Sequence, residues 1–304
     1  METEFDPLTT AHINLQLEEF PKIQLAAEKF VIWFQPVYEL DTGGVLHNEV
    51  LVRWRDEEGN LRQPQELLSA LQNTQLLNQL DRIVVEKSIA ILSQQTSVKL
   101  SVNLSNDIFE DQGFLPQLNL WFTQYKVAPK RLAFEIEEET LFQKQSLILP
   151  FMTELQMMGC YVVVDNFTGR FFPLSQLQEL PIKMIKLDRS FALQPITLDK
   201  KQLAKAISYA SRAFQRQTIL KGIDDNSSLK LASDLGIKGV QGYSLGKPQD
   251  KPKTFRLFGV ILFKIIATLI FLYIVKSLLG INIFPEHHAW EIIIDFFQSI
   301  FDGK

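Results

Sequence analysis

The sequence contains very little cysteine and histidine. Its 304 residues include one cysteine, Cys160, and four histidines. A single thiol cannot form an internal disulfide, which suits a reducing compartment. Cys160 directly precedes an apolar run, so we expect a buried structural thiol. His287 and His288 are adjacent, so on a helix they would point apart and make a poor metal pair.

The sequence also lacks a strong charge bias and a secretory signal. The net charge is −4, which gives no indication of a nucleic-acid-binding protein. The N-terminus is acidic and has neither a basic segment nor an apolar segment of the kind that signal peptides use. We therefore expect the main domain to lie in the cytoplasm.

What the sequence does contain, from residue 30 onward, is a regular alternation of short apolar runs with helix-period segments. The runs predict strands over 30–37, 45–54, 98–104, 131–137, 161–165, 182–188, 218–221 and 239–243. The segments between them predict helices over 64–72, 76–93, 114–125, 146–158, 173–180, 200–215 and 226–235.

About eight strands mostly separated by helices predict an α/β fold, a modified TIM (β/α)8 barrel. The turn at 41–44 makes a hairpin of the first two strands, so one strand should be antiparallel. An open doubly wound sheet is the structural alternative.

Polar residues stand at the ends of most of these strands. The stretch from Tyr161 to Arg170 is typical: an apolar run stops at Asp165 and Asn166. An aspartate after an ordinary core strand is common in turns, but here the arrangement recurs. The strand-end residues are Gln35, Glu49, Arg53, Asn103, Glu135, Asp165, Asn166, Lys186, Asp188, Lys221 and Gln241. In a barrel they would converge on one rim.

Two kinds of ligand fit this rim. The oxygens of Glu49, Asn103, Glu135 and Asp165, without nearby cysteine or histidine, suit Mg²⁺ or Mn²⁺ over zinc. The cations Arg53, Lys186 and Lys221 suit a phosphate.

The same residues carry a family resemblance. The segments Glu49–Trp54, Ser101–Ser105, Phe134–Glu138, Asp165–Phe167, Lys186–Phe191 and Val240–Tyr243 resemble, in order and spacing, the motifs of the EAL-domain cyclic di-GMP phosphodiesterases. The match covers roughly residues 30–250. The resemblance implies a modified TIM barrel with one antiparallel strand. It also implies hydrolysis of cyclic di-GMP to the linear dinucleotide pGpG with two divalent metals.

The resemblance assigns a role to each matching residue. Glu49, Asn103, Glu135 and Asp165 match metal ligands, and Lys186 matches the lysine that helps to activate water. Arg53 matches a phosphate contact, and Gln35 and Gln241 match residues on the substrate side.

Three departures from the family pattern affect this site. Asn166 replaces the second aspartate, which bridges both metals in the family, and Lys221 stands where the family has a metal-site glutamate. The loop after Asn166 runs into Phe171 and Phe172 in place of small residues. A lysine about 4 Å from a dication would be unfavourable by roughly 8 kcal/mol at an effective dielectric constant of about 20.

These departures favour a non-catalytic protein in cyclic di-GMP signalling, either a metal-independent nucleotide receptor or a protein-interaction module. An active Mg²⁺- or Mn²⁺-dependent phosphodiesterase that tolerates Asn166 is the alternative, and a nucleotide-independent adaptor is the second. Lys221 could also pair with Glu135 or Asp165 and close the site. A protein partner is not identified by the sequence, and a homodimer stays open.

The termini define the remaining parts of the chain. We expect an N-terminal extension over 1–28, the barrel over 29–250 and a basic linker over 251–256. Lys264 is the only strongly polar residue over 257–275. We therefore predict a single membrane-spanning helix over 257–279 that holds the barrel on the cytoplasmic side of the cell membrane. Residues 280–304 predict an amphipathic tail. A soluble helical hairpin over 257–301 is the alternative.

Overall fold

The computed structural model describes residues 25–56, 58–63, 76–193, 195–254 and 268. The chain divides into two compact units, Met1–Phe255 and Arg256–Lys304. All of the described residues except Thr268 belong to the first unit.

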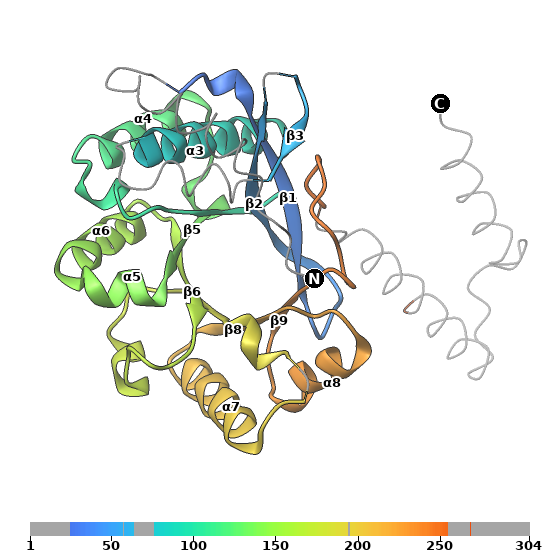
Figure 1. The fold of residues 1–304 in the computed structure, drawn as a ribbon. Coiled ribbons are helices and arrows are strands. Elements are labelled where there is room, and N and C mark those ends of the chain that lie inside the picture. Colours follow the sequence, from blue (N-terminus) through green and yellow to red (C-terminus); the bar gives the residue numbers. More distant parts are fainter. Residues whose placement is uncertain (1–24, 57, 64–75, 194, 255–267, 269–304) are drawn as a thin grey trace, which may run out of the picture. The chain divides into compact units, whose positions relative to one another are not determined.

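The first unit is built around a closed barrel, seen nearly end-on in Figure 1. Its strands, within the described part of the chain, are β1 (Phe30–Glu39), β2 (Val45–Arg55), β3 (Leu61–Arg62), β4 (Leu100–Asn103), β5 (Leu132–Glu137), β6 (Tyr161–Phe167), β7 (Met184–Leu187), β8 (Gln217–Lys221) and β9 (Gly239–Gln241). Neighbours run in the order β1-β9-β8-β7-β6-β5-β4-β2-β3, and β1 also pairs with β2. The short β3 only extends the β2 edge.

The strand directions confirm the predicted modified barrel. β2 and β4 to β9 are parallel neighbours, whereas β1 is antiparallel to both β2 and β9. The open-sheet alternative is wrong, because these two pairings of β1 leave no open edge between β2 and β9. The β1–β2 hairpin turns at Gly43, whose φ of 65° lies in the left-handed region that glycine adopts without strain. It sets Gln35 opposite Glu49.

Helices surround the barrel (Figure 1). In the described segments they are α3 (Leu76–Gln94), α4 (Phe114–Gln124), α5 (Glu138–Gln143), α6 (Gln145–Met157), α7 (Leu198–Ala213) and α8 (Asn226–Asp234). All but α5 were expected, and the expected segment 173–180 forms a 3-10 helix over Leu174–Gln178. The expected helix over 64–72 lies outside the described residues.

The core has two parts. The larger lies between the strands and the helices and includes Cys160, which is buried as predicted. The smaller is an apolar layer that consists of Val37, Ala133, Val163, Met184 and Ile219. Alternate residues of a strand face the same side of the sheet, so this layer defines the residues that point into the barrel.

The segment after β9 returns to the β1–β2 hairpin. The backbone groups of Gln249 and Phe34 exchange two hydrogen bonds, of 2.7 and 3.0 Å. The side chain of Asn48 donates to the Lys253 carbonyl and accepts from the Lys253 amide, both at 2.9 Å. The Lys253 ammonium also contacts the Tyr38 hydroxyl at 2.8 Å. Residues 249–253 are therefore joined to both strands of the hairpin.

No helix among the described residues is long and apolar enough to cross a membrane. The predicted membrane-spanning segment, 257–279, lies outside the described residues except for Thr268, and the predicted tail, 280–304, lies wholly outside them.

Candidate functional site

The candidate site is a polar layer directly above the apolar layer inside the barrel. Moving two residues toward the carboxyl end of β5 to β8 leads from Ala133, Val163, Met184 and Ile219 to Glu135, Asp165, Lys186 and Lys221. Residues two apart on a strand share a face, so these four side chains point into the barrel together. The structure thus brings the predicted strand-end residues to one rim.

At the centre of this layer Lys186 joins two carboxylates. Its side chain is fully buried, and its ammonium lies 2.5 Å from Glu49 Oε2 and 2.7 Å from Glu135 Oε2. Asn103 donates to Glu49 Oε1 at 3.0 Å, and Gln241 donates to Glu49 Oε2 at 2.7 Å. Both oxygens of Glu49 are therefore occupied, whereas Glu135 Oε1 has no hydrogen-bond partner among the described residues.

The two carboxylates differ in their pKa. Burial alone would raise the pKa of Glu49, but the charge and hydrogen bond of Lys186 and the hydrogen bond of Gln241 lower it to about 2. Burial, together with the charges of Glu49 and Asp165, raises the pKa of Glu135 to about 7 despite the attraction of Lys186. Without further cations, Glu135 is thus the carboxylate that takes up a proton near neutral pH.

Lys221 forms a second ion pair in the same layer. Its ammonium lies 2.7 and 2.9 Å from the two oxygens of Asp165 and 2.5 Å from Asn166 Oδ1. The side chain of Lys221 is 19% exposed and that of Asp165 is 8% exposed, so the pair lies at the mouth of the barrel. Of the two partners considered for Lys221 in a closed site, the structure shows Asp165.

Asn166 reaches Lys221 because the end of β6 is irregular. The pairing with β7 shifts register between Val164 and Phe167, and Asn166 has a φ of 50°. Asparagine tolerates this left-handed conformation better than most residues. Its amide nitrogen donates to Glu137 at 2.9 Å while its oxygen accepts from Lys221.

Glu138 holds the loop that follows β6. It is 1% exposed and accepts hydrogen bonds from the Thr168 amide, the Thr168 hydroxyl and the Gly169 amide, at 2.7, 2.8 and 3.1 Å. The sequence reasoning gave Glu138 no role among the consecutive acidic residues 137–139. The feature of the sequence that could have indicated this role is the position of Glu138 directly after β5, as the first residue of α5.

The remaining predicted residues lie around this layer. Gln241 also donates to Gln35 at 3.4 Å, and Gln35 donates to the Gly246 carbonyl at 3.2 Å. Arg53 contacts none of the site carboxylates: it lies 5.5 Å from the centre of the Trp33 ring, and burial lowers its pKa. Asp188 caps the turn after β7 by accepting from the Ser190 amide at 2.9 Å.

The close approach of the loops after β8 and β9 requires a glycine at position 242. A Cβ atom at Gly242 would lie 2.0 Å from the carbonyl oxygen of Ile223. This distance is too short for any residue other than glycine. The Ile223 amide donates to the Gln241 carbonyl at 3.0 Å. Gly242 therefore allows the loops after β8 and β9 to meet beside Lys221 and Gln241.

A pair of divalent metals does not fit this arrangement of side chains. All the donor atoms are oxygens of the kind that Mg²⁺ and Mn²⁺ prefer, and Glu135 Oε1 is free to bind. However, no three acidic, histidine or cysteine side chains in the described segments gather around one point. Lys186 separates Glu49 from Glu135, and Lys221 covers both oxygens of Asp165.

The fold and the site define the class: a TIM-type barrel with one antiparallel strand and a rim of carboxylates, amides and lysines. A family model for the EAL domain matches residues 19–248, so the chain belongs to the EAL-domain family.

Individual relatives are distant. The cyclic di-GMP phosphodiesterase RocR of Pseudomonas aeruginosa is 24% identical over 78% of this chain and 63% of its own length. The FimX EAL domain of P. aeruginosa, solved bound to c-di-GMP, is 26% identical with a TM-score of 0.70 over 80% of this chain and 97% of that one. The FimX EAL domain of Xanthomonas citri, in complex with c-di-GMP, has 20% identity and a TM-score of 0.71 over 80% and 96%. The chain spans 36% and 63% of the first two curated relatives that it matches.

Proposed function

We propose that this chain is a receptor for cyclic di-GMP that binds the nucleotide without metal and does not hydrolyse it. The observation that carries the proposal is the position of Lys221. Lys221 stands where the family pattern has a metal-binding glutamate. Its ammonium binds both oxygens of Asp165. A lysine in this place supplies positive charge at the mouth of the barrel without a metal ion.

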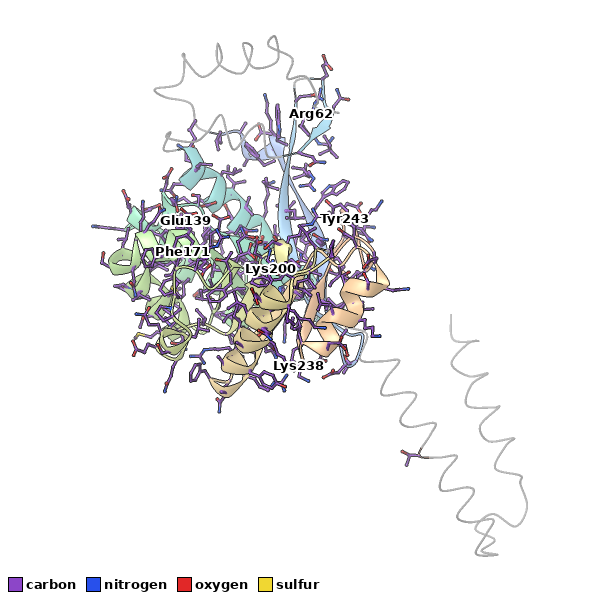
Figure 2. All side chains as sticks on the ribbon, turned by 60° about the horizontal axis from the view of Figure 1, so that its bottom comes forward. Arg62, Glu139, Phe171, Lys200, Lys238 and Tyr243 are labelled. Carbon is purple, nitrogen blue, oxygen red and sulfur yellow. The ribbon has the colours of Figure 1, made fainter. Side chains whose placement is uncertain are left out.

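Two of the three predicted cations are available for a phosphate. Lys221 is 19% exposed, and Arg53 is half-buried near Tyr243, which is 61% exposed on the rim (Figure 2). Lys186 is fully buried between two carboxylates, so a phosphate at the mouth cannot reach its ammonium. We therefore assign phosphate binding to Arg53 and Lys221. Gln35 and Gln241 line the same mouth.

Calorimetric titration of cyclic di-GMP into the full chain, in EDTA and again in Mn²⁺, tests the proposal. Micromolar binding in EDTA that is lost in Lys221→Glu and kept in Lys230→Glu supports it. Lys230 is an exposed lysine of α8 and is a matched control for the change in charge. Absence of binding in EDTA, or binding that Lys221→Glu leaves unchanged, contradicts it.

An active phosphodiesterase is the alternative, and the shared layer of Glu49, Asn103, Glu135, Asp165 and Lys186 favours it. In that case bound Mg²⁺ or Mn²⁺ would displace the lysines from the carboxylates and supply the nucleophilic water. Formation of pGpG by the purified chain with Mn²⁺, abolished by Glu49→Ala, would establish hydrolysis and exclude the receptor.

A nucleotide-independent adaptor is the second alternative, and an aromatic patch favours it. Phe142 of α5 is 48% exposed and lies 5.5 Å from Phe171 and 5.8 Å from Phe172, ring centre to ring centre. The patch could meet a protein partner or a second copy of the chain. A Phe142→Glu variant that abolishes a complex while cyclic di-GMP has no effect would support the adaptor.

We also propose that residues 257–279 anchor the barrel on the cytoplasmic side of the cell membrane, in agreement with their apolar composition and the preceding Lys251, Lys253 and Arg256. The expected result is recovery of the full chain with membranes after carbonate washing. Recovery in the soluble fraction would contradict the anchor.

A further inference from the structure

A second polar site lies at the opposite end of the barrel. In Figure 2, Lys238 precedes β9 and marks one end of the barrel, and Tyr243 follows β9 and marks the other end. At the end marked by Lys238 a cavity of about 170 Å³ opens where the strands begin. The polar residues that line it include His47, Lys99, Lys130, Arg131, Tyr161 and Lys183.

The strand register places this cavity below the apolar layer. Two residues before Val163 on β6 lies Tyr161, and two residues before Ala133 lies Arg131, which directly precedes β5. Lys99 and Lys183 directly precede β4 and β7. The apolar layer therefore separates the cavity from the Glu49 and Lys186 layer, and the two sites are distinct.

No carboxylate of the described residues compensates the charge of the cavity. Its lining includes four cations and no aspartate or glutamate. Arg131 donates to the carbonyls of Leu92, Gln95 and Val98, none of which carries a charge. Within the described segments Lys99, Lys130 and Lys183 form no ion pair with a carboxylate, whereas Lys238 at the same end of the barrel pairs with Asp41.

Like charges around one cavity repel each other, and an anion in the cavity relieves this repulsion. Convergent cations in a concave site raise the local concentration of anions. The arrangement thus favours a ligand with more than one negative charge.

His47 provides an independent indication of a ligand. It is 4% exposed, it lines the cavity, and its Nε2 atom has no hydrogen-bond partner among the described residues. A buried polar atom without a partner costs about 1–3 kcal/mol. Polar oxygens of a ligand in the cavity would complete the hydrogen bonding of this imidazole.

We propose that this cavity binds phosphate or a phosphate ester. Lys99, Lys130 and Lys183 compensate its charge, Arg131 contributes a fixed positive charge, and His47 Nε2 donates to a phosphate oxygen. Tyr161 is 37% exposed and lines the cavity, so its ring would contact a small organic group on an ester. The site is independent of the nucleotide site at the other end of the barrel.

Calorimetric titration of inorganic phosphate into the full chain tests the proposal, with chloride held constant. We expect saturable binding that the double variant Lys130→Gln/Lys183→Gln weakens at least tenfold. Both lysines are exposed, so the variant should fold like the wild type. Lys238→Gln removes a cation at the same end but outside the cavity, and this control should bind phosphate like the wild type.

A second measurement observes the imidazole directly. Phosphate should shift the ¹⁵N resonance of His47 Nε2 in the wild type and leave His12, His287 and His288 unchanged. No saturable binding, or binding that the double variant retains, overturns the proposal. Loss of binding in Lys238→Gln would also overturn it, because the phosphate would then bind outside the cavity.

Discussion

Lys221 holds both carboxylate oxygens of Asp165, at 2.7 and 2.9 Å, across the mouth of the barrel. The two residues come from β8 and β6, which β7 separates in the sheet. The ion pair therefore spans the strand that carries Lys186. It lies in the same layer as the Glu49, Lys186 and Glu135 cluster and is more exposed than that cluster.

Removal of the Lys221 charge should destabilise the protein. In Lys221→Met the Asp165 carboxylate, 8% exposed, loses its partner, and we expect a decrease of about 1–3 kcal/mol in the free energy of unfolding. Urea denaturation measures it. Lys230→Met, on the exposed side of α8, should stay within about 0.5 kcal/mol of the wild type. Equal stability of Lys221→Met and wild type would show that the ion pair is not formed in solution.

Restoring the family residues should create a metal site. Asn166→Asp with Lys221→Glu places three carboxylates at the rim and removes the ammonium, so the metal-free double variant should unfold at a lower temperature than wild type. Mn²⁺ should raise its unfolding temperature, because a ligand that binds only the folded state stabilises it. The wild type should show no such increase in a thermal scan with Mn²⁺. An equal effect of Mn²⁺ on both proteins would mean that Lys221 does not exclude metal.

Lys186 should be the more important of the two lysines for stability. Lys186→Met leaves Glu49 and Glu135 facing each other in the barrel, and breaking a buried ion pair by removing one partner costs about 3–5 kcal/mol. Denaturant unfolding should show a larger decrease in the free energy of unfolding for Lys186→Met than for Lys221→Met. In Lys186→Met, Glu135, whose pKa is already raised to about 7, should take up a proton at neutral pH, so adding Glu135→Gln should change the stability little. A double variant clearly more stable than Lys186→Met would show that both carboxylates stay charged.

Glu138 should control the loop after β6. In Glu138→Ala the amides of Thr168 and Gly169 lose their acceptor, so hydrogen exchange at these two amides should accelerate at least tenfold. Glu139→Ala removes the neighbouring exposed carboxylate and serves as control (Figure 2). Unchanged exchange in Glu138→Ala would show that other contacts hold the loop.

Asp81 should make stability decrease as the pH rises. It is 8% exposed, and burial raises its pKa to about 7, although it accepts two hydrogen bonds from Ser105. The contribution of Asp81 to the free energy of unfolding is fully present below about pH 4, which is the pKa of Asp81 in the unfolded chain. This contribution is lost as the pH rises through about 7. The total loss is of order 4 kcal/mol, from about 1.4 kcal/mol per pKa unit. Asp81→Asn should flatten the stability profile between pH 5 and pH 8 relative to wild type. Parallel profiles would contradict the shifted pKa.

The barrel and its rim could be predicted from the sequence for a physical reason. Buried parallel strands need continuous apolar runs, and the runs end where polar residues such as Asp165 and Lys186 begin. The partners of these residues could not be predicted, because pairing depends on rotamers and on which strands adjoin. The sequence left two partners open for Lys221. The pairing of β6 with β7 and of β7 with β8 brings Lys221 to Asp165. The role of Glu138 and the cavity at His47 were not predicted either, because each brings together residues that lie far apart in the sequence.

The attachment of residues 249–253 to the hairpin has a mechanical consequence. The segment is bonded to Phe34, Tyr38 and Asn48. Phe34 and Asn48 directly precede Gln35 and Glu49 on β1 and β2. A force applied to this segment would therefore act on the backbone one residue away from two side chains of the candidate site.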